Sequence, residues 1–431
     1  MPLETSPQIA LRAKYVFPVE GPPIEGGVVT LSGERIVAVG KSSDAAAVHD
    51  LGNVAILPGL VNAHSHLEFS SLQRPLGEPG MALPDWIRQV IAYRGRGDLD
   101  IPSAIARGLA ECSASGTTVL AEIATAPIET YAVEAYATGA DQPHVGSIDL
   151  MLLHEVIGFS EPRSQSAFDA VMDRLNSFDT QSDVQPGISP HAPYTVHPKL
   201  LDRIVAYSAE HRTLLAMHVA ESQEELQLLR DGDGALRDLL EERSMWDATA
   251  IARGSRPLDY LRRLAKADHA LVVHGNYLDA EELQFLGNHR ERLSLVYCPR
   301  THEFFDHTTY PLQQALSLGV RVVLGTDSRA SNPDVILWEE MRYVAKHHAG
   351  VSAERILRMG TLDGARGLRC DDRAGSLICG KSADLAIVAL AEQRMSDPHK
   401  ALSELLLDEA SQVVQTWHRG RAVWPKRGNG E

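Results

Sequence analysis

The chain has few cysteines and no long apolar run, and each absence excludes a class of protein. Its four cysteines, in 431 residues, form no C-X-X-C pair, which excludes a cysteine-rich zinc module and is typical of a reducing compartment. No apolar stretch approaches the roughly 18 residues that cross a membrane, and the first residues do not resemble a signal peptide. We therefore expect a cytoplasmic protein without a membrane partner.

Positive charge is also scarce. The 41 Lys and Arg residues are outnumbered by 57 Asp and Glu residues, which gives a formal net charge of −16. Nucleic-acid binding relies on clustered basic residues, and no basic run here exceeds two residues. The composition, 44% hydrophobic and 23% charged, is that of a globular protein. The sequence predicts a small-molecule substrate and no nucleic-acid partner; a homodimer remains possible.

Both ends of the chain carry short alternating segments that predict β-strands. These segments lie at residues 9–17, 26–31, 35–40, 383–390 and 412–417. We expect the two ends to form one composite β-sandwich domain, made of residues 1–58 and 371–431.

Apolar runs alternate with helix-period segments in residues 59–370. The runs predict eight strands, at 54–64, 117–122, 145–153, 185–190, 213–218, 270–274, 293–298 and 321–326. Helices are predicted between them, for example at 84–93, 198–211, 279–286 and 334–347. This order predicts an α/β fold, a (β/α)8 TIM barrel, although a doubly wound open sheet has the same alternation.

Residues that can bind metal follow several of the predicted strands. They are His64, His66, His218, His274 and Asp327. In a parallel barrel the carboxyl ends of all strands open onto one face, so these side chains should converge. Imidazole and carboxylate groups are ligands of zinc and similar divalent ions. A shared location therefore favours a metal site over five unrelated strand ends.

With their flanking segments, these residues resemble the amidohydrolase superfamily, in its metal-dependent deaminase and chlorohydrolase branch. The matching segments are residues 58–66, 218–221, 272–275, 324–328 and 375–385. They occur in the family's order between about residue 8 and residue 424. The resemblance implies a barrel with a β-sandwich formed from both termini, and hydrolysis of carbon–nitrogen bonds other than peptide bonds.

The resemblance also implies a ligand set. It implies that His64, His66, His218 and Asp327 bind one divalent ion, Zn²⁺ or alternatively Fe²⁺, that His274 orients the attacking water, and that Glu221 transfers protons. The predicted catalytic residues are thus Glu221, His274 and Asp327, of which Asp327 can also accept the proton of the water. The fourth predicted strand contains no Lys of the kind that bridges two metals in dinuclear members, which favours one ion.

The residues themselves suggest a reaction. A divalent ion held by three imidazoles and a carboxylate lowers the pKa of its water from about 16 towards 7 and so supplies hydroxide. Glu221, three residues after His218, can lie beside the ion without binding it, and can carry protons to a ring nitrogen and to departing ammonia. An amino-substituted ring carbon suits this arrangement.

The segments are most similar to those of S-adenosylhomocysteine, methylthioadenosine and aminodeoxyfutalosine deaminases. Their His-Ala-Pro-Tyr-Thr element for substrate contact is matched by residues 191–195. We predict hydrolytic deamination of an aminopurine nucleoside, with triazine dechlorination or imidazolone ring opening as alternatives. An inactive scaffold is disfavoured, because every ligand and Glu221 are retained. The candidate substrate contacts are His191, Trp86, Glu68, Arg300 and His302.

Overall fold

Eight parallel strands form one sheet, whose order follows the chain from β8 to β15. The strands are β8 (Leu60–Ser65), β9 (Thr117–Ala124), β10 (Asp149–Val156), β11 (Val184–Pro190), β12 (Leu214–Val219), β13 (His269–His274), β14 (Leu293–Tyr297) and β15 (Val322–Leu324). A parallel bridge between Ser65 and Asp327 joins the first strand to the segment after the last. This computed structural model describes residues 8–45, 47–126, 128–131, 148–177, 184–390 and 397–425. The predicted TIM barrel is confirmed.

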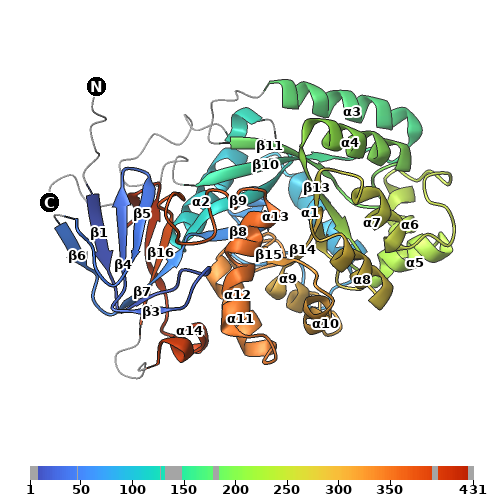
Figure 1. Cartoon of the computed structure of the whole chain (residues 1–431). Helices are drawn as coiled ribbons and strands as arrows, with labels where there is room; N and C mark the ends of the chain where they lie inside the picture. The colour runs from blue at the N-terminus through green and yellow to red at the C-terminus, as the bar shows by residue number, and fades with distance from the viewer. Residues whose placement is uncertain are drawn as a thin grey trace.

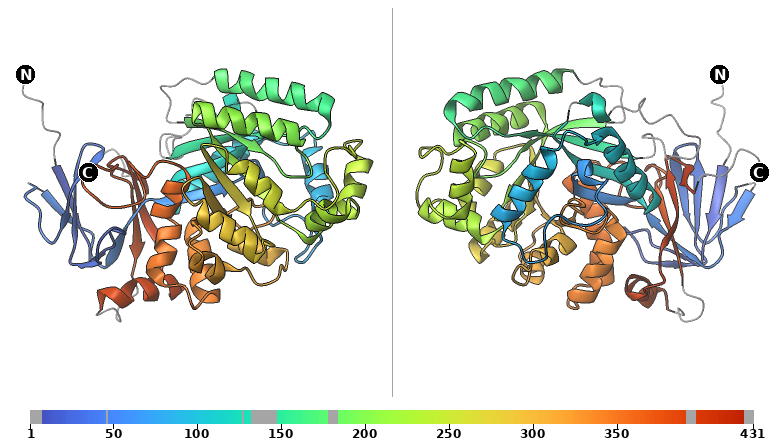
Figure 2. Two further views of the ribbon diagram at one scale, coloured as in Figure 1. Left: turned by 45° about the vertical axis from the view of Figure 1, so that its right-hand side comes forward. Right: turned by 180° about the vertical axis from the view of Figure 1, so that it is seen from behind.

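Helices surround the barrel, as the views in Figure 1 and Figure 2 show. They are α1 (Leu83–Arg94), α2 (Ile101–Ala114), α3 (Glu161–Asn176), α4 (Pro198–His211), α5 (Gln223–Asp231), α6 (Ala235–Glu242), α7 (Pro257–Leu264), α8 (Ala280–Asn288), α9 (Pro299–Phe304), α10 (Leu312–Ser317), α11 (Leu337–His347), α12 (Ala353–Met359), α13 (Leu362–Gly367) and α14 (Pro398–Leu407). Two 3-10 turns, η1 (Leu67–Phe69) and η2 (Ile128–Tyr131), follow β8 and β9.

The barrel interior is a packed apolar core. Alternate residues of successive strands contribute to it, among them Ala63, Ala121, Leu153, Ala216 and Val273, all with no exposed surface. The residues that follow these positions, at the carboxyl ends of the strands, lie towards the open face of the barrel. The apolar core thereby forms the floor beneath the polar residues of that face.

Two further sheets pack against each other at the other end of the molecule (Figure 1). One has the order β5-β4-β1-β6 and the other the order β18-β17-β16-β7-β2-β3. Their strands are β1 (Gln8–Arg12), β2 (Tyr15–Val16), β3 (Ile24–Glu25), β4 (Val28–Ser32), β5 (Arg35–Gly40), β6 (Ala47–Asp50), β7 (Val54–Pro58), β16 (Leu385–Ala389), β17 (Val413–His418) and β18 (Arg421–Trp424). Strands from both ends of the chain thus form the expected β-sandwich; the residue boundaries of the domains stay a prediction.

The single strand expected at 54–64 is two strands in two sheets. β7 pairs with β16 in the sandwich, whereas β8 pairs with β9 in the barrel. The break falls at Gly59, where a Cβ atom would lie 2.1 Å from Oγ1 of Thr118. A continuous apolar run does not reveal a change of sheet, because both strands are buried. The segment 9–17 divides in the same way, into β1 and β2.

Other predicted bounds shift by a few residues. The helix expected at 334–347 begins at Leu337, because the carboxylate of Asp334 accepts a hydrogen bond from the Ile336 amide and so holds a turn before the helix. The strand expected at 145–153 continues to Val156, while 145–147 lie outside the described residues.

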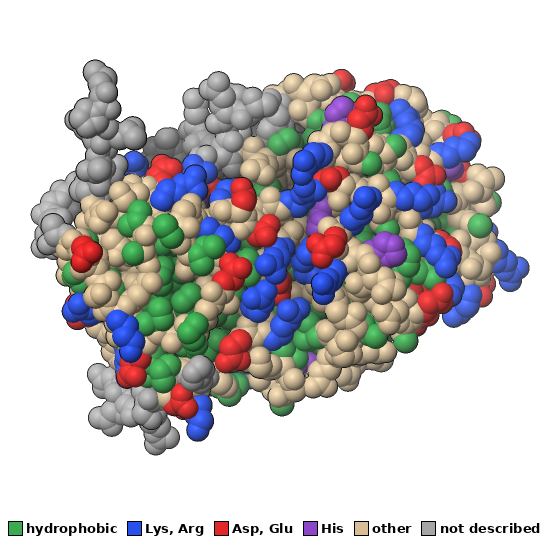
Figure 3. Space-filling model, viewed as in Figure 1, with side chains coloured by type: hydrophobic (Ala, Val, Ile, Leu, Met, Phe, Trp, Pro, Cys, Tyr) green, Lys and Arg blue, Asp and Glu red, His purple; other side chains and the backbone are tan. Residues whose placement is uncertain are grey.

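Figure 3 shows one face of the outer surface. Acidic and basic side chains are interspersed there, without a continuous basic area. Among the described residues, no helix combines the length and the apolar character needed to span a membrane.

Candidate active site

The carboxyl ends of β8, β12, β13 and β15 bring the five predicted strand-end residues together. The ring centre of His64 lies 4.9 Å from that of His66 and 5.0 Å from that of His218, and the rings of His218 and His274 are 5.3 Å apart. The Asp327 Oδ1 atom is 3.7 Å from Nε2 of His64 and 3.8 Å from Nε2 of His66. Three imidazoles and one carboxylate therefore face a common point.

These residues fit a divalent ion. One ring nitrogen from each of His64, His66 and His218 lies within 4.8 Å of the others. Both nitrogens of His64 and Nδ1 of His66 are buried without a hydrogen-bond partner among the described residues. Buried polar atoms are costly unless they are paired, so a bound cation would resolve this deficit.

The imidazoles are held in the form that binds metal. Burial lowers the pKa of His64 and His66 well below the usual value, and the neighbouring imidazoles lower it further. Burial also lowers the pKa of His218 to about 4. Only the neutral ring offers a nitrogen lone pair to a cation. Nδ1 of His218 donates to the carbonyl oxygen of His191, 2.9 Å away, which leaves Nε2 for the ion.

Local backbone irregularities aim several of these side chains. Val61 and Ala63 face the barrel interior, so strict alternation would turn His64 outward. The register of β8 against β9 is irregular between Asn62 and Ser65, which brings His64 back to the site. His274 and Asp327 have positive φ angles of 67° and 56°. Such conformations are strained in residues other than glycine and cluster at functional sites.

A buried polar network holds the segment that carries Asp327. The Asp327 Oδ2 atom accepts from Oγ of Ser331 at 3.0 Å, and the amide of Asp327 donates to the carbonyl oxygen of His64 at 3.0 Å. Burial raises the pKa of Asp327 to about 7, although hydrogen bonds from Ser331 and Thr301 oppose the increase. Asn332 donates to the Thr326 carbonyl oxygen and to Oε1 of Glu340, both at 2.7 Å. The backbone and side chain of Asp327, the candidate carboxylate ligand, are thus held by His64 and Ser331.

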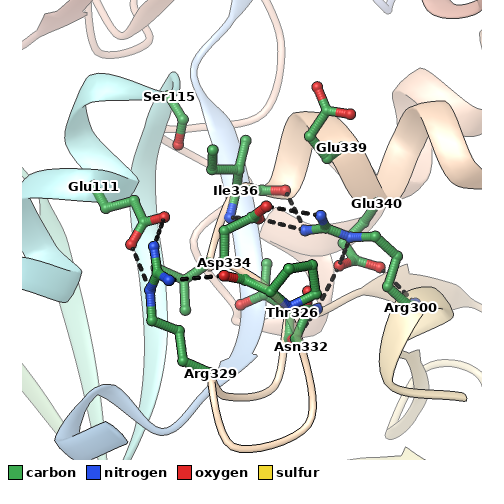
Figure 4. Close-up of polar contacts among 12 residues, drawn as sticks. Glu111, Ser115, Arg300, Thr326, Arg329, Asn332, Asp334, Ile336, Glu339 and Glu340 are labelled. Atoms are coloured by element: carbon green, nitrogen blue, oxygen red, sulfur yellow. Dashed lines mark hydrogen bonds and ion pairs between the residues drawn. The ribbon is translucent and has the colours of Figure 1, made fainter. Parts of the chain in front are cut away.

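Arg300 belongs to this network and not to the substrate cavity. Figure 4 shows its guanidinium between Asp334 and Glu340. Nη2 lies 2.5 Å from Oδ1 of Asp334, and Nε lies 2.7 Å from Oε1 of Glu340. The predicted substrate contact therefore finds its donors already bound, and Arg300 instead joins the loop after β15 to α11.

Glu221 is placed beside the candidate ligands. Its Oε1 atom lies 3.5 Å from Nε2 of His274. Burial raises the pKa of Glu221 well above its usual value, and the charges of Asp327 and Glu225 raise it further. The protonated carboxyl is consequently favoured, which suits a group that first donates a proton.

Glu225, which the sequence reasoning missed, fixes the backbone at Glu221. Its two carboxylate oxygens accept from the amides of Ala220 and Glu221, both at 2.9 Å. Ala220 has a positive φ of 55°, so this clamp holds a strained turn between His218 and Glu221. Its sequence signal is a carboxylate four residues after Glu221, in the first turn of α5.

We expect Glu225→Gln to lower kcat about 10- to 100-fold with KM nearly unchanged and the metal content unaltered, because an amide group cannot accept from both backbone donors. Glu282→Gln is the matched control: Glu282 is also buried and accepts from two amides, those of Leu258 and Asp279, in α8. Steady-state kinetics and thermal melting of both variants check this. A kcat loss of equal size in both variants would contradict the positioning role.

The site opens into a cavity of about 270 Å³. Its lining includes the predicted His66, His218, Glu221, His274 and Asp327, together with His191 and Trp86. The indole Nε1 of Trp86 donates to the carbonyl oxygen of Ala330 at 3.1 Å, so that the ring is fixed as a wall. The apolar part of the lining is Phe69, Leu83, Ile87, Val90, Ile91, Ile157, Leu239, Leu240 and Met245.

Two other predicted substrate contacts do not line this cavity. Glu68 is buried and bound by Arg94, whose Nη2 lies 2.6 Å from its Oε1, and by Oγ1 of Thr125 at 3.0 Å. His302 is buried against the rings of Tyr297 and Tyr310. Arg94, the partner of Glu68, does line the cavity.

Further residues of the site were not anticipated from the sequence. Arg94 and Glu155 line the cavity, and Glu122 supports the end of β8 by accepting from Oγ of Ser65 at 2.6 Å and from the Leu67 amide at 2.8 Å. Burial raises the pKa of Glu122 well above its usual value. A carboxylate within a largely apolar strand is the available signal for Glu122 and Glu155.

Known proteins share both the sequence and the fold. The model of the Amidohydrolase family matches residues 55–423. A 5-methylthioadenosine/S-adenosylhomocysteine deaminase of Moorella thermoacetica is 25% identical over 429 residues, which cover 95% of this chain and 92% of that protein. Helicobacter pylori aminofutalosine deaminase, solved in complex with methylthio-coformycin, superposes with a TM-score of 0.81 at 21% identity, over 96% of this chain and 99% of that one. For an adenosine deaminase from Xanthomonas campestris with bound zinc, the TM-score is 0.75 at 24% identity, over 97% and 93% of the chains.

Proposed function

Because the chain belongs to the amidohydrolase family, we propose that it is a metal-dependent hydrolase that converts an aminopurine nucleoside to its oxo form and releases ammonia. One observation carries this proposal: the buried carboxyl of Glu221 lies 3.5 Å from Nε2 of His274, and both line, with His66, His218 and Asp327, a cavity with a largely apolar wall. The name of the Moorella thermoacetica relative supports the choice of an adenine nucleoside.

The ion would be held by His64, His66, His218 and Asp327. When bound, it acts as a Lewis acid that makes water a nucleophile near neutral pH. Zinc is our proposed ion, because imidazole and carboxylate ligands suit its borderline character, and Fe²⁺ is the alternative. The strand that ends next to His191 has no Lys that could bridge a second ion.

Glu221 would move the protons of the reaction. In its protonated form, Oε donates to a nitrogen of the purine ring, which makes the adjacent carbon electrophilic. The resulting carboxylate takes up one proton from the attacking water and delivers it to the departing amine, and the second proton of the water returns to Glu221 as the carbonyl forms. One water is thus consumed, one ammonia leaves and Glu221 is protonated again. His274, whose Nε2 lies 3.5 Å from Oε1 of Glu221, orients the water.

The proposal extends to the surroundings of the reaction. The four cysteines are free thiols, three of them buried, which supports a reducing compartment and thus the cytoplasm. We keep the domain boundaries at 1–58 with 371–431 for the sandwich and at 59–370 for the barrel.

The test is ammonia release by the metal-loaded protein. The panel contains adenosine, methylthioadenosine, S-adenosylhomocysteine, aminodeoxyfutalosine, guanine, cytosine and a chlorotriazine. We expect one ammonia per turnover of at least one adenine nucleoside. Chloride release from the triazine would replace the deaminase proposal by a chlorohydrolase. Silence on every nucleoside, with metal demonstrably bound, would refute it.

A further inference from the structure

Glu155 is a carboxylate in the cavity to which the proposed reaction gives no role. It lies near the end of β10, two residues after Leu153, and alternation places it on the interior face that Met151 and Leu153 share. Three carboxylates of the described residues line the cavity. Glu221 and Asp327 belong to the reaction centre, which leaves Glu155 as the third.

The carboxylate of Glu155 has few polar neighbours within the described ranges. Its side chain is only 9% exposed, and it forms one ion-pair contact, 4.0 Å between Oε1 and Nε2 of His191. No hydrogen bond to either oxygen is found among these residues. A carboxylate that is removed from water needs hydrogen-bond donors. We therefore expect a bound ligand to donate hydrogen bonds to Glu155.

Arg94 compensates the charge of Glu155 without occupying its oxygens. The guanidinium is bound to Glu68, with Nη2 2.6 Å from Oε1. The pKa of Arg94 is raised: burial lowers it, but the charges of Glu68 and Glu155 outweigh that effect. The cation therefore stabilises two carboxylates, one hydrogen-bonded to it and one open to the cavity. This arrangement favours a neutral hydrogen-bond donor at Glu155.

The order of the strands places Glu155 beyond His191 from the reaction centre. The sheet runs β13-β12-β11-β10, so its successive strand ends present His274, His218, His191 and Glu155. The ring centre of His191 lies 5.1 Å from that of His218. A planar ring held between Glu221 and His191 would thus direct its substituent towards β10.

We propose that Glu155 accepts hydrogen bonds from the sugar hydroxyls of the substrate, and that it selects ribonucleosides over deoxynucleosides and free bases. This proposal rests on the function proposed above. Two adjacent hydroxyls offer two donors, and a carboxylate offers two acceptor oxygens. The same cavity is lined by the apolar side chains of Ile157, Leu240 and Met245 and by Arg243, so a group attached to the sugar would meet a mostly apolar wall with one cation.

The experiment compares substrates as well as variants. The nucleoside turned over fastest in the panel is compared with its 2′-deoxy, 3′-deoxy and 2′,3′-dideoxy analogues, in the unchanged protein, in Glu155→Gln and in Glu161→Gln. Glu161→Gln is the control for charge, because exposed Glu161 follows the same strand and pairs with Lys199 outside the cavity. Metal content and melting temperature are measured for each protein.

We expect the unchanged protein and Glu161→Gln to prefer the ribonucleoside to the dideoxy analogue about 30-fold in kcat/KM, as charge-assisted hydrogen bonds allow. In Glu155→Gln, kcat/KM for the ribonucleoside should fall until most of this preference is lost, while kcat/KM for the dideoxy analogue should stay within about twofold of its value in the unchanged protein.

Three results would overturn the inference. The first is equal kcat/KM for the ribonucleoside and the dideoxy analogue in the unchanged protein, a result that can be obtained without any variant. The second is an equal loss on all analogues in Glu155→Gln. The third is a preference for the ribonucleoside over the dideoxy analogue that is as large in Glu155→Gln as in the unchanged protein. Absence of ammonia release from every nucleoside would instead refute the proposed deamination. Failure of the proposed function can thus be distinguished from failure of the proposal for Glu155.

Discussion

Replacement of Glu221 by Gln is expected to reduce kcat about 1,000-fold and to leave the bound metal in place. The amide retains the shape of the side chain but cannot donate and then accept a proton, and proton transfer of this kind contributes on the order of 100- to 10,000-fold. Oε1 of Glu221 lies 3.5 Å from Nε2 of His274, whereas the carboxylate within 4 Å of both His64 and His66 is that of Asp327. This variant should therefore lose most of its activity and keep its full metal content.

Ammonia release and elemental analysis of one preparation measure both quantities. The informative control is Glu282→Gln, the same chemical change in a buried carboxylate of α8, which should retain full activity. If Glu221→Gln were to keep more than about a tenth of the kcat, another group would have to carry the protons. If it were to lose the metal, Glu221 would be a ligand.

Loss of the ion is expected from His218→Ala, with turnover falling below detection. His218 supplies one of three convergent nitrogens, and its Nδ1 is fixed by the carbonyl oxygen of His191, so that its Nε2 is the atom lost. His191→Ala is the matched comparison. It removes a partly exposed imidazole whose ring centre is 5.1 Å from that of His218, and retains the backbone carbonyl.

We expect one ion per chain in the unchanged protein and in His191→Ala, and less than about 0.1 in His218→Ala. Chelation of the unchanged protein should abolish ammonia release, and added zinc should restore it, because a ligand set that is folded before binding can be refilled. Equal metal loss in both variants would argue against the ligand assignment, and two ions per chain would argue against a mononuclear site.

The barrel and the convergence of the ligands were predictable from the sequence, because they follow from periodicity. Alternation alone directs His218 to the same face as Ala216. It fails for His64 and His274, which reach the site through an irregular register and a positive φ. The sequence indicates these residues because a predicted strand ends at each of them. It does not indicate the direction in which their side chains point.

Residues that act across long separations could not be assigned in the same way. Arg300 follows a strand of the barrel and resembles a substrate contact, but its partner Glu340 is 40 residues away on α11. Glu155 and Glu225 lie in segments whose pattern is that of ordinary strand and helix, and only the three-dimensional arrangement shows which atoms their oxygens face. Side-chain pairing depends on the packing of separate elements, which periodicity does not specify.

The pairing of β7 with β16 bears on the order in which this molecule can be completed during its synthesis. β7 ends at Pro58 and β8, which carries His64, begins at Leu60, yet the antiparallel neighbour of β7 starts only at Leu385. While the ribosome makes the intervening residues, β7 has one edge without its final partner, and an unpaired edge invites association with other chains. β16 pairs with that edge once it is made. A chain that ends between Asp327 and Leu385 would therefore contain all the proposed metal ligands and still lack the strand that pairs with β7.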